Sequence, residues 1–325
     1  MDETHRFSVH LTLVLKSRVL IAPLHWGLGH ATRCIPLIHE QIGLGNEVVV
    51  AATGGPKEVI QSAFPNIEFI DIPFMTISYP ADGNMARHFF WKGPRLIRSI
   101  WNEHRLLQKV VVNRKIDLVI SDSRFGLWSR KAKSVFVTHQ VHIISPVFEG
   151  LINALNRWVL NKYDEVWIPD FESRPGLAGK LSHPIKLPEH ASYIGPLSRF
   201  TGKEPVTERA WENVGIVSGP EPQRSLFEAE LARRFIESGK PSLIIQGKPH
   251  CDSKKEVGEL TVVSHLDTDD FIIALKSADH IYCRSGYSTI MDLHALGLNA
   301  TFFATPGQTE QEYLAELHAP AQEID

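Results

Sequence analysis

The sequence predicts an α/β protein built from two doubly wound domains. Short apolar strands alternate with helical patterns along the chain, as in parallel sheets covered by helices. A Gly-Pro pair at 195–196 and the polar run after it interrupt this alternation, which resumes at about residue 214. We therefore predict an extension over residues 1–16, a first Rossmann-like domain over 17–198, a linker over 199–212 and a second Rossmann-like domain over 213–325.

The expected strands of the first domain are continuous apolar runs, as buried parallel strands usually are. We place them at 18–23, 46–52, 67–72, 117–122, 134–138 and 165–168, with helical stretches over about 94–113 and from about 147. In the second domain we place strands at 214–217, 242–245, 260–263, 280–283 and 300–303.

Composition narrows the class of protein. The chain has 325 residues, of which 43% are hydrophobic and 22% charged, as is normal for a soluble globular protein. A net charge of −3 gives no reason to expect a nucleic-acid partner. The three cysteines, at 34, 251 and 283, are far apart and lack metal spacing, which favours reduced thiols in a cytoplasmic protein. No apolar run is long enough to span a bilayer, and the N-terminal residues do not form a convincing signal peptide.

The stretch from 283 to 311 carries the most informative pattern: strand, tight turn, helix, strand and polar loop. The N-terminus of a helix offers unpaired amides and a partial positive charge, so it suits a phosphate group. A carboxylate further along that helix could accept hydrogen bonds from the two hydroxyls of a ribose. The candidate donor-binding residues of this stretch are Arg284, Ser285, Gly286, Tyr287, Ser288, Thr289, Asp292, Gln308, Glu310 and Gln311.

This stretch resembles the donor-binding signature of the MurG-type UDP-N-acetylglucosamine transferases, in the GT-B class. The resemblance implies that the Arg-Ser-Gly turn holds the UDP diphosphate, that Asp292 binds the ribose, and that the 308–311 loop reads the sugar. Here Asp292 replaces the usual Glu and Glu310 stands where a second Gln is usual, which leaves the sugar open. The likeness extends from Gly27 to Gln311 and implies a donor bound without metal or other cofactor. Such chains usually end with a helix that crosses back to the first domain, and we expect either that this helix is missing here or that the chain is shortened.

A second loop in the same half, Gly215 to Arg224, begins the second domain. MurG-like chains carry a Gly-Gly-Ser loop near the diphosphate at this place, so Ser218 and Gly219 are candidates for donor binding. The alternative is an ordinary turn between a strand and a helix.

In the first domain, Gly27-Leu-Gly-His30 follows the first strand, where open α/β sheets bind ligands. Gly27 and Gly29 permit close approach of a ligand, and the imidazole of His30 could take a proton from an acceptor hydroxyl or water. The alternative is a histidine that only caps the helix.

Asp122 ends the fourth strand and would approach His30 if the first and fourth strands were neighbours. A carboxylate there would orient the imidazole, as in the His–Asp pair of plant-type GT-B glycosyltransferases. The alternative is a carboxylate that only caps the following turn. Arg124 and His139 are further candidates for the acceptor side. We assign no metal to His139 and His142, because no acid or cysteine cluster accompanies them.

Residues 87–115 combine eight Lys or Arg with interleaved aromatic and aliphatic residues, against one acid, Glu103. A basic amphipathic helix can lie on an anionic membrane, and in MurG-like enzymes a patch in this half faces a lipid-linked acceptor. The alternative is a helix that packs on the sheet with a solvated basic side.

Together these features predict an inverting GT-B glycosyltransferase. It would move N-acetylglucosamine or a related sugar from a UDP-sugar to a glycan or lipid-linked acceptor, with His30 as base, in the cytoplasm or at the inner face of the membrane. The Gly-His-Ala-Thr-Arg-Cys run at 29–34 also resembles the nucleotide-sugar hydrolase of pseudaminic acid biosynthesis. A hydrolase, a UDP-sugar epimerase of the same fold and a non-catalytic nucleotide-sugar-binding protein are therefore the rival interpretations.

Overall fold

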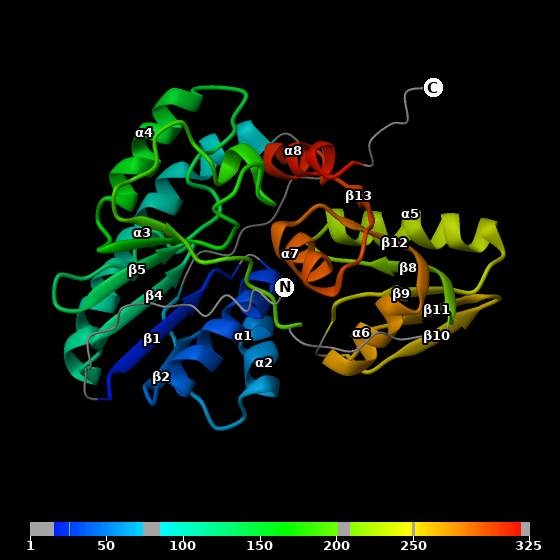
Figure 1. Cartoon of the computed structure of the whole chain (residues 1–325), viewed down its shortest axis with the longest axis horizontal. Coiled ribbons are helices and arrows are strands. Elements are labelled where there is room, and N and C mark those ends of the chain that lie inside the picture. Colours follow the sequence, from blue (N-terminus) through cyan, green and yellow to red (C-terminus); the bar gives the residue numbers. More distant parts are fainter. Residues whose placement is uncertain (1–15, 26, 74–84, 201–208, 249–250, 320–325) are drawn as a thin grey trace.

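The chain contains two parallel-stranded sheets, each flanked by helices, side by side in Figure 1. The computed structural model describes residues 16–25, 27–73, 85–200, 209–248 and 251–319, and the backbone alone for 85–92. This architecture confirms the predicted α/β class with two Rossmann-like domains. Most of the expected N-terminal extension, the central part of the expected linker and the side chains of 87–92 lie outside the described residues.

The first sheet has seven parallel strands in the order β3-β2-β1-β4-β5-β6-β7. Its strands are β1 (Arg18–Pro23), β2 (Glu47–Ala51), β3 (Glu68–Ile70), β4 (Leu118–Asp122), β5 (Lys133–Val137), β6 (Glu165–Ile168) and β7 (Ala191–Tyr193). Its helices are α1 (Leu28–Gly43), α2 (Gly54–Ala63), α3 (Met85–Arg114) and α4 (Glu149–Leu160), with a short 3₁₀ turn η1 (Gly179–Leu181).

The second sheet has six strands in the order β10-β11-β9-β8-β12-β13. Its strands are β8 (Trp211–Ile216), β9 (Ser242–Ile245), β10 (Lys254–Val257), β11 (Leu260–Val263), β12 (Ala278–Arg284) and β13 (Thr301–Phe303). Its helices are α5 (Gln223–Ser238), α6 (Thr268–Lys276), α7 (Tyr287–Leu296) and α8 (Thr309–Leu317). All neighbouring pairs are parallel except β10 with β11.

Every strand predicted from an apolar run is present, but two short strands were missed. The strand β7 covers only three residues, and β10 is an exposed edge strand of sequence Lys-Lys-Glu-Val. An edge strand needs only one hydrogen-bonded neighbour and buries little, so it requires no apolar pattern. The long helix α3 also begins about nine residues before the predicted start.

The strand orders bring two switch points to the junction between the domains. In the first sheet β1 lies between β2 and β4, and in the second β8 lies between β9 and β12. The loops at the carboxyl ends of such strands are the usual ligand-binding places of open α/β sheets. One core cluster crosses the junction and joins buried residues of β1 and α1 to Tyr287, Ile290 and Met291 of α7 and Leu314 of α8.

The helix α8 of the second domain contacts the first domain. The Tyr313 hydroxyl accepts a hydrogen bond from the Lys180 amide at 2.8 Å, and the Thr309 hydroxyl donates to the Ile144 carbonyl at 2.8 Å. The helix α8 thus reaches the first domain (Figure 1).

Arg124, which we proposed for the acceptor side, is instead a structural residue. Its side chain is fully buried and paired with Glu103 of α3. Its guanidinium also donates to the carbonyls of Ala51, the last residue of β2, at 3.2 Å and of Ile72, just after β3, at 2.6 Å. The proposed role is therefore wrong, because the guanidinium joins α3 to the sheet and is too deeply buried to reach an acceptor.

Replacement of Glu103 by Gln should leave the Arg124 cation buried without its counterion. We expect a loss of about 3–5 kcal/mol in the free energy of unfolding, measured by chemical denaturation. The control is Glu230→Gln, which removes a solvent-exposed partner of Arg233 and should change stability by less than about 1 kcal/mol. Equal losses in the two variants would contradict a structural role for the buried pair.

Candidate functional site

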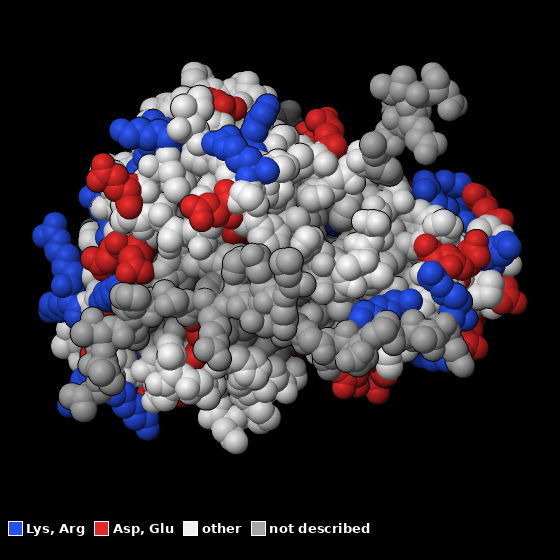
Figure 2. Space-filling view, in the orientation of Figure 1, with Lys and Arg blue, Asp and Glu red and all other residues white. Residues whose placement is uncertain are grey.

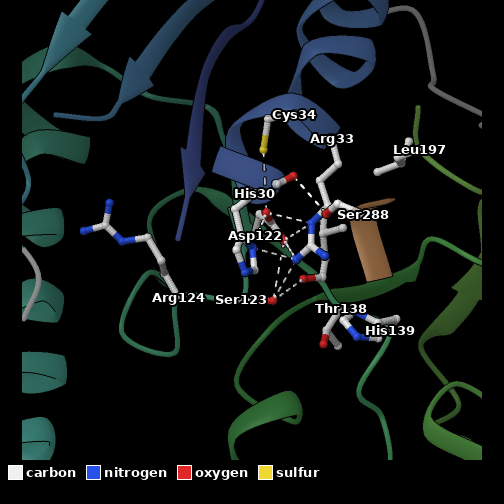
Figure 3. Close-up of polar contacts among 12 residues, drawn as sticks. His30, Arg33, Cys34, Asp122, Ser123, Arg124, Thr138, His139, Leu197 and Ser288 are labelled. Atoms are coloured by element: carbon white, nitrogen blue, oxygen red, sulfur yellow. Dashed lines mark hydrogen bonds and ion pairs between the residues drawn. The ribbon is translucent and has the colours of Figure 1, made fainter. Parts of the chain in front are cut away.

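The predicted pair of His30 and Asp122 is formed. Strands β1 and β4 are neighbours, and their register places Pro23 beside Asp122. His30 lies in the first turn of α1, and its Nδ1 is 2.9 Å from Oδ2 of Asp122 (Figure 3). Asp122 is fully buried, whereas the side chain of His30 remains 22% exposed. The geometry is that of an imidazole held at one nitrogen by a carboxylate, with the other nitrogen available for chemistry.

Arg33 completes this cluster, and we did not predict it. The Arg33 Nε lies 3.0 and 2.9 Å from the two oxygens of Asp122, and its Nη2 also pairs with Oδ1. The same Nη2 is 2.7 Å from Nδ1 of His30 and 3.2 Å from Oγ of Ser123. The available signal was the spacing of His30 and Arg33, because residues three apart share a helix face.

The electrostatic environment lowers the pKa of both His30 and Asp122. Burial lowers the pKa of His30, and the Arg33 guanidinium lowers it further, against the opposing effect of Asp122. Burial opposes ionisation of Asp122, but Arg33 and His30 outweigh it and hold its pKa at about 2. The carboxylate is therefore ionised at neutral pH, and the imidazole is neutral and able to accept a proton.

His25 is also in this loop, but its environment does not suit a base. Its Nε2 accepts a hydrogen bond from the Thr53 amide at 3.1 Å. Burial and the nearby Arg124 cation lower its pKa to about 4. The nitrogen that could accept a substrate proton is thus already occupied by the backbone.

The N-termini of α1 and α7 meet at the junction of the domains. Oγ of Ser288, in the first turn of α7, donates to the Gly29 carbonyl in the first turn of α1 at 3.0 Å. Neither first turn contains an acidic residue, so the partial positive charges of both helices are uncompensated by side chains of their own. His30 follows Gly29 directly, so the predicted base and the predicted phosphate-binding helix lie beside each other (Figure 3).

Hydrogen bonds from the side chains of Arg284 and Ser285 hold the turn before α7. Its guanidinium donates to the carbonyls of Ala304 at 2.6 Å and Gln223 at 3.3 Å and packs over the ring of Phe227. The Ser285 side chain is buried and donates to the carbonyl of Gln311 at 2.7 Å. The terminal nitrogens of Arg284 therefore hold these loops together, and its part in donor binding stays a prediction.

Tyr287, His139 and Glu310 form a bridge between the domains. The Tyr287 hydroxyl donates to the Pro169 carbonyl at 2.7 Å, and its ring stacks on His139 with centroids 4.1 Å apart. Nε2 of His139 is 2.7 Å from Oε1 of Glu310, and the Gln140 amide donates to the other oxygen of Glu310. Burial opposes the ionisation of Glu310, but His139, Arg33 and His30 lower its pKa. Residues 308–311, which we predicted as a loop, form the N-cap and first turn of α8 and reach the first domain close to His30.

The remaining candidates line the same edges of the two sheets. Gln308 caps α8, and the Gln311 side chain accepts from the Thr305 amide at 2.9 Å. Ser218 and Gly219 follow β8, the direct neighbour of β12, and Gly219 has a φ of +97° that favours glycine. Gly27 precedes α1 with φ +150°, Gly286 precedes α7, and Thr289 lies in the first turn of α7.

Asp292 faces the connection between the domains. Its Oδ1 accepts a hydrogen bond from the Ser198 hydroxyl at 2.6 Å. Burial raises the pKa of this carboxyl to about 6, although Ser198 and Arg199 act against the shift. One carboxylate oxygen of Asp292, the residue that we expect to bind the ribose, therefore already accepts a hydrogen bond from the segment that joins the domains.

The described residues contain neither a metal-ligand cluster nor a membrane-spanning helix. No group of three or more His, Cys, Asp or Glu side chains there could hold a metal ion. No helix within those residues is long and apolar enough to cross a membrane.

Similarity to known proteins covers almost the whole chain. It is 23% identical over 311 residues to uncharacterized glycosyltransferases of Methanosarcina acetivorans and Methanosarcina mazei, with 88% of this chain and 79% of each relative aligned. Among solved structures, it resembles the glycosyltransferase SnogD from Streptomyces nogalater, at TM-score 0.61, 16% identity and coverage of 93% of this chain and 85% of that one. The chain has the GT-B fold.

Other structures with this fold contain ligands. The spinosyn rhamnosyltransferase SpnG complexed with thymidine diphosphate matches at TM-score 0.60 and 13% identity over 91% of this chain and 83% of that one. Arabidopsis thaliana UGT89C1 complexed with UDP-L-rhamnose matches at 0.58 and 12% over 89% and 80%. No protein-family model matches the chain. The named relatives and the GT-B fold support a transferase enzyme, more specifically a glycosyltransferase.

The position of Asp292 predicts a pH-dependent stability. Because the folded-state pKa of about 6 exceeds the usual value near 3.9, the folded state binds more protons between these values, and ionisation costs stability as the pH rises through this window. Asp292→Asn, which can still accept from Ser198, should avoid that cost. We expect the variant to gain about 1–2 kcal/mol over the wild type above pH 6 and to lose this advantage near pH 4, by denaturation at both pH values. A difference that does not change with pH would contradict the assignment.

Proposed function

We propose that this protein is an inverting glycosyltransferase that moves a sugar from a UDP-sugar to an acceptor hydroxyl. The observation that carries the proposal is the position of His30, beside the point where the N-termini of α1 and α7 meet. A base and two positive helix ends at one junction suit a reaction in which a hydroxyl is deprotonated and a diphosphate departs. The GT-B fold and the named relatives support the same conclusion.

In this mechanism the first domain activates the acceptor. Asp122 holds Nδ1 of His30, and Nε2 removes the hydroxyl proton as the acceptor oxygen attacks the anomeric carbon. The bond from that carbon to the diphosphate breaks on the opposite face, so the configuration inverts. The amides at the start of α7 stabilise the departing charge electrostatically. Ser218 and Gly219 add backbone donors from the neighbouring loop.

Sequence resemblance supports N-acetylglucosamine or a related sugar as the transferred group. Asp292 would use its second oxygen for the ribose, and Glu310, Gln308 and Gln311 would accept or donate hydrogen bonds to the sugar. Two GT-B neighbours are complexed with other nucleotides, one with thymidine diphosphate and one with the nucleotide sugar UDP-L-rhamnose. A panel of nucleotide sugars, followed by thermal shift, identifies the donor because a ligand raises apparent stability. Product analysis then separates transfer from release of free sugar, from epimerisation and from binding without reaction; only transfer supports this proposal.

The His30 assignment predicts a specific kinetic defect. His30→Ala should reduce turnover about a hundredfold or more, the usual scale for loss of a general base. Affinity for UDP should barely change, because the nucleotide contacts belong to the second domain. Calorimetry with UDP and steady-state rates across pH measure both effects. Full turnover in the variant, with an acceptor that the wild type uses, would remove His30 from the mechanism.

A lipid-linked acceptor and peripheral contact with the inner face of a membrane form the second part of the proposal. The observation that favours it is the surface of α3, where Ile97 is 69% exposed and Trp101 is 55% exposed. The Arg105 guanidinium lies 3.9 Å from the Trp101 ring centroid, so apolar and cationic groups share this surface. On the face shown in Figure 2, by contrast, acidic and basic side chains are interspersed at both ends.

If α3 meets a membrane, anionic vesicles should bind the protein and salt should release it. Replacing Arg95, Arg98 and Arg105 together with Gln should abolish binding in a sedimentation assay. The control replaces the three cations Arg233, Arg234 and Lys240 at the far end of the second domain and should leave binding intact. Equal binding to neutral and anionic vesicles would count against the surface.

A further inference from the structure

Arg33 has an unusual place for a cation next to a histidine base. It lies one helical turn after His30 on α1, and its side chain is only 2% exposed. Its guanidinium contacts both oxygens of Asp122, the same carboxylate that contacts His30. A buried cation so close to an imidazole disfavours the imidazolium, so the cluster is built differently from a simple pair of histidine and carboxylate.

Hydrogen counting in this cluster decides the tautomer of His30. Nη2 of Arg33 carries two hydrogens and has three neighbours, namely Oδ1 of Asp122, Oγ of Ser123 and Nδ1 of His30. Oδ2 of Asp122 can only accept, and it lies 2.9 Å from that Nδ1. A lone pair on Nδ1 would face the lone pairs of Oδ2, so Nδ1 carries the proton and donates it to Asp122. The hydrogens of Nη2 then go to Asp122 and Ser123, and Nε2 of His30 is left with a lone pair.

The net charge of the cluster also favours a neutral His30. With His30 neutral, the buried Arg33 and Asp122 charges cancel. Protonation of His30 would leave a net positive charge among buried groups, and burial without compensation is costly. The other titratable groups around His30 are Cys34 on α1, His25 after β1, His139 after β5 and Glu310 on α8; of these the Glu310 carboxylate alone favours the imidazolium.

We propose that Arg33 is a positioning residue that compensates the charge of Asp122, so that this carboxylate holds Nδ1 of His30 while the Arg33 cation disfavours the imidazolium and keeps Nε2 free to accept a proton. This inference rests on the proposed function of His30 as the base, and it extends that function to a residue that does not touch the acceptor. It implies that the enzyme retains turnover at pH values where an ordinary His–Asp pair would already be protonated.

The test measures the protonation of His30 directly. In protein labelled with ¹³C-histidine, the His30 signal is assigned by its loss in His30→Ala and titrated by NMR. Arg33→Gln should raise the pKa of His30 by about one unit or more, because a nearby positive charge is removed. The control Arg233→Gln removes an exposed cation from α5 and should leave the His30 titration unchanged.

Arg33→Gln leaves Asp122 buried without its cation and could fail to fold. A second pair of variants keeps the test decisive in that case. The double variant Arg33→Gln with Asp122→Asn is neutral at both positions and is compared with Asp122→Asn alone. The pKa of His30 should be higher in the double variant than in Asp122→Asn. An unchanged or lower pKa after loss of Arg33, in either comparison, would overturn the proposal.

Activity measurements separate the proposal that His30 is the base from the proposal that Arg33 controls the protonation of His30. The acid limb of the pH–rate profile should move upward with the NMR titration, so turnover of Arg33→Gln falls about tenfold for each pH unit of that shift on the limb. If the NMR pKa rises and the limb does not move, Arg33 controls His30 as proposed but His30 is not the base. If neither moves, the role of Arg33 is wrong whatever the identity of the base.

Discussion

The contact between α7 and the start of α1 is the constraint on which the candidate site depends. A side chain at Gly29 would place its Cβ 2.9 Å from Oγ of Ser288, closer than such atoms approach in proteins, so glycine at residue 29 lets the two helix ends meet without a shift of Ser288. Tyr287 and Met291 bury the next turn of α7 in the core of the first domain. This packing holds the phosphate-binding element of one domain against the base of the other.

The same junction brings charged groups of the two domains together. Arg33 and Asp122 are buried together in the first domain, and Glu310 comes from the second domain to meet His139. Each buried charge has a partner of opposite sign or a set of hydrogen bonds, which is the condition for keeping it there. Domain packing and the protonation of the site are therefore linked, because Glu310 reaches the histidines only when α8 lies on the first domain.

Sequence reasoning succeeded where a local pattern had one physical solution. Continuous apolar runs such as 18–23 and 242–245 are buried parallel strands, and the structure contains them at these places. It failed where burial did not dictate sequence, as in the charged edge strand β10. It also misjudged Arg124, because an arginine near the end of a strand can bind a ligand or hold the backbone equally well, and the choice depends on carbonyl groups far away in the sequence.

The sequence by itself determined the α/β class, the positions of the main strands and the places of His30 and Asp122 at strand ends, since strand ends and glycine turns follow from local chemistry. Only the tertiary structure decided that β1 pairs with β4, that Arg33 lies between His30 and Asp122, and that Asp292 turns toward Ser198. These outcomes depend on strand order and on the packing of α7 against α1. Both are set by contacts between residues about 90 or more positions apart, which no local pattern records.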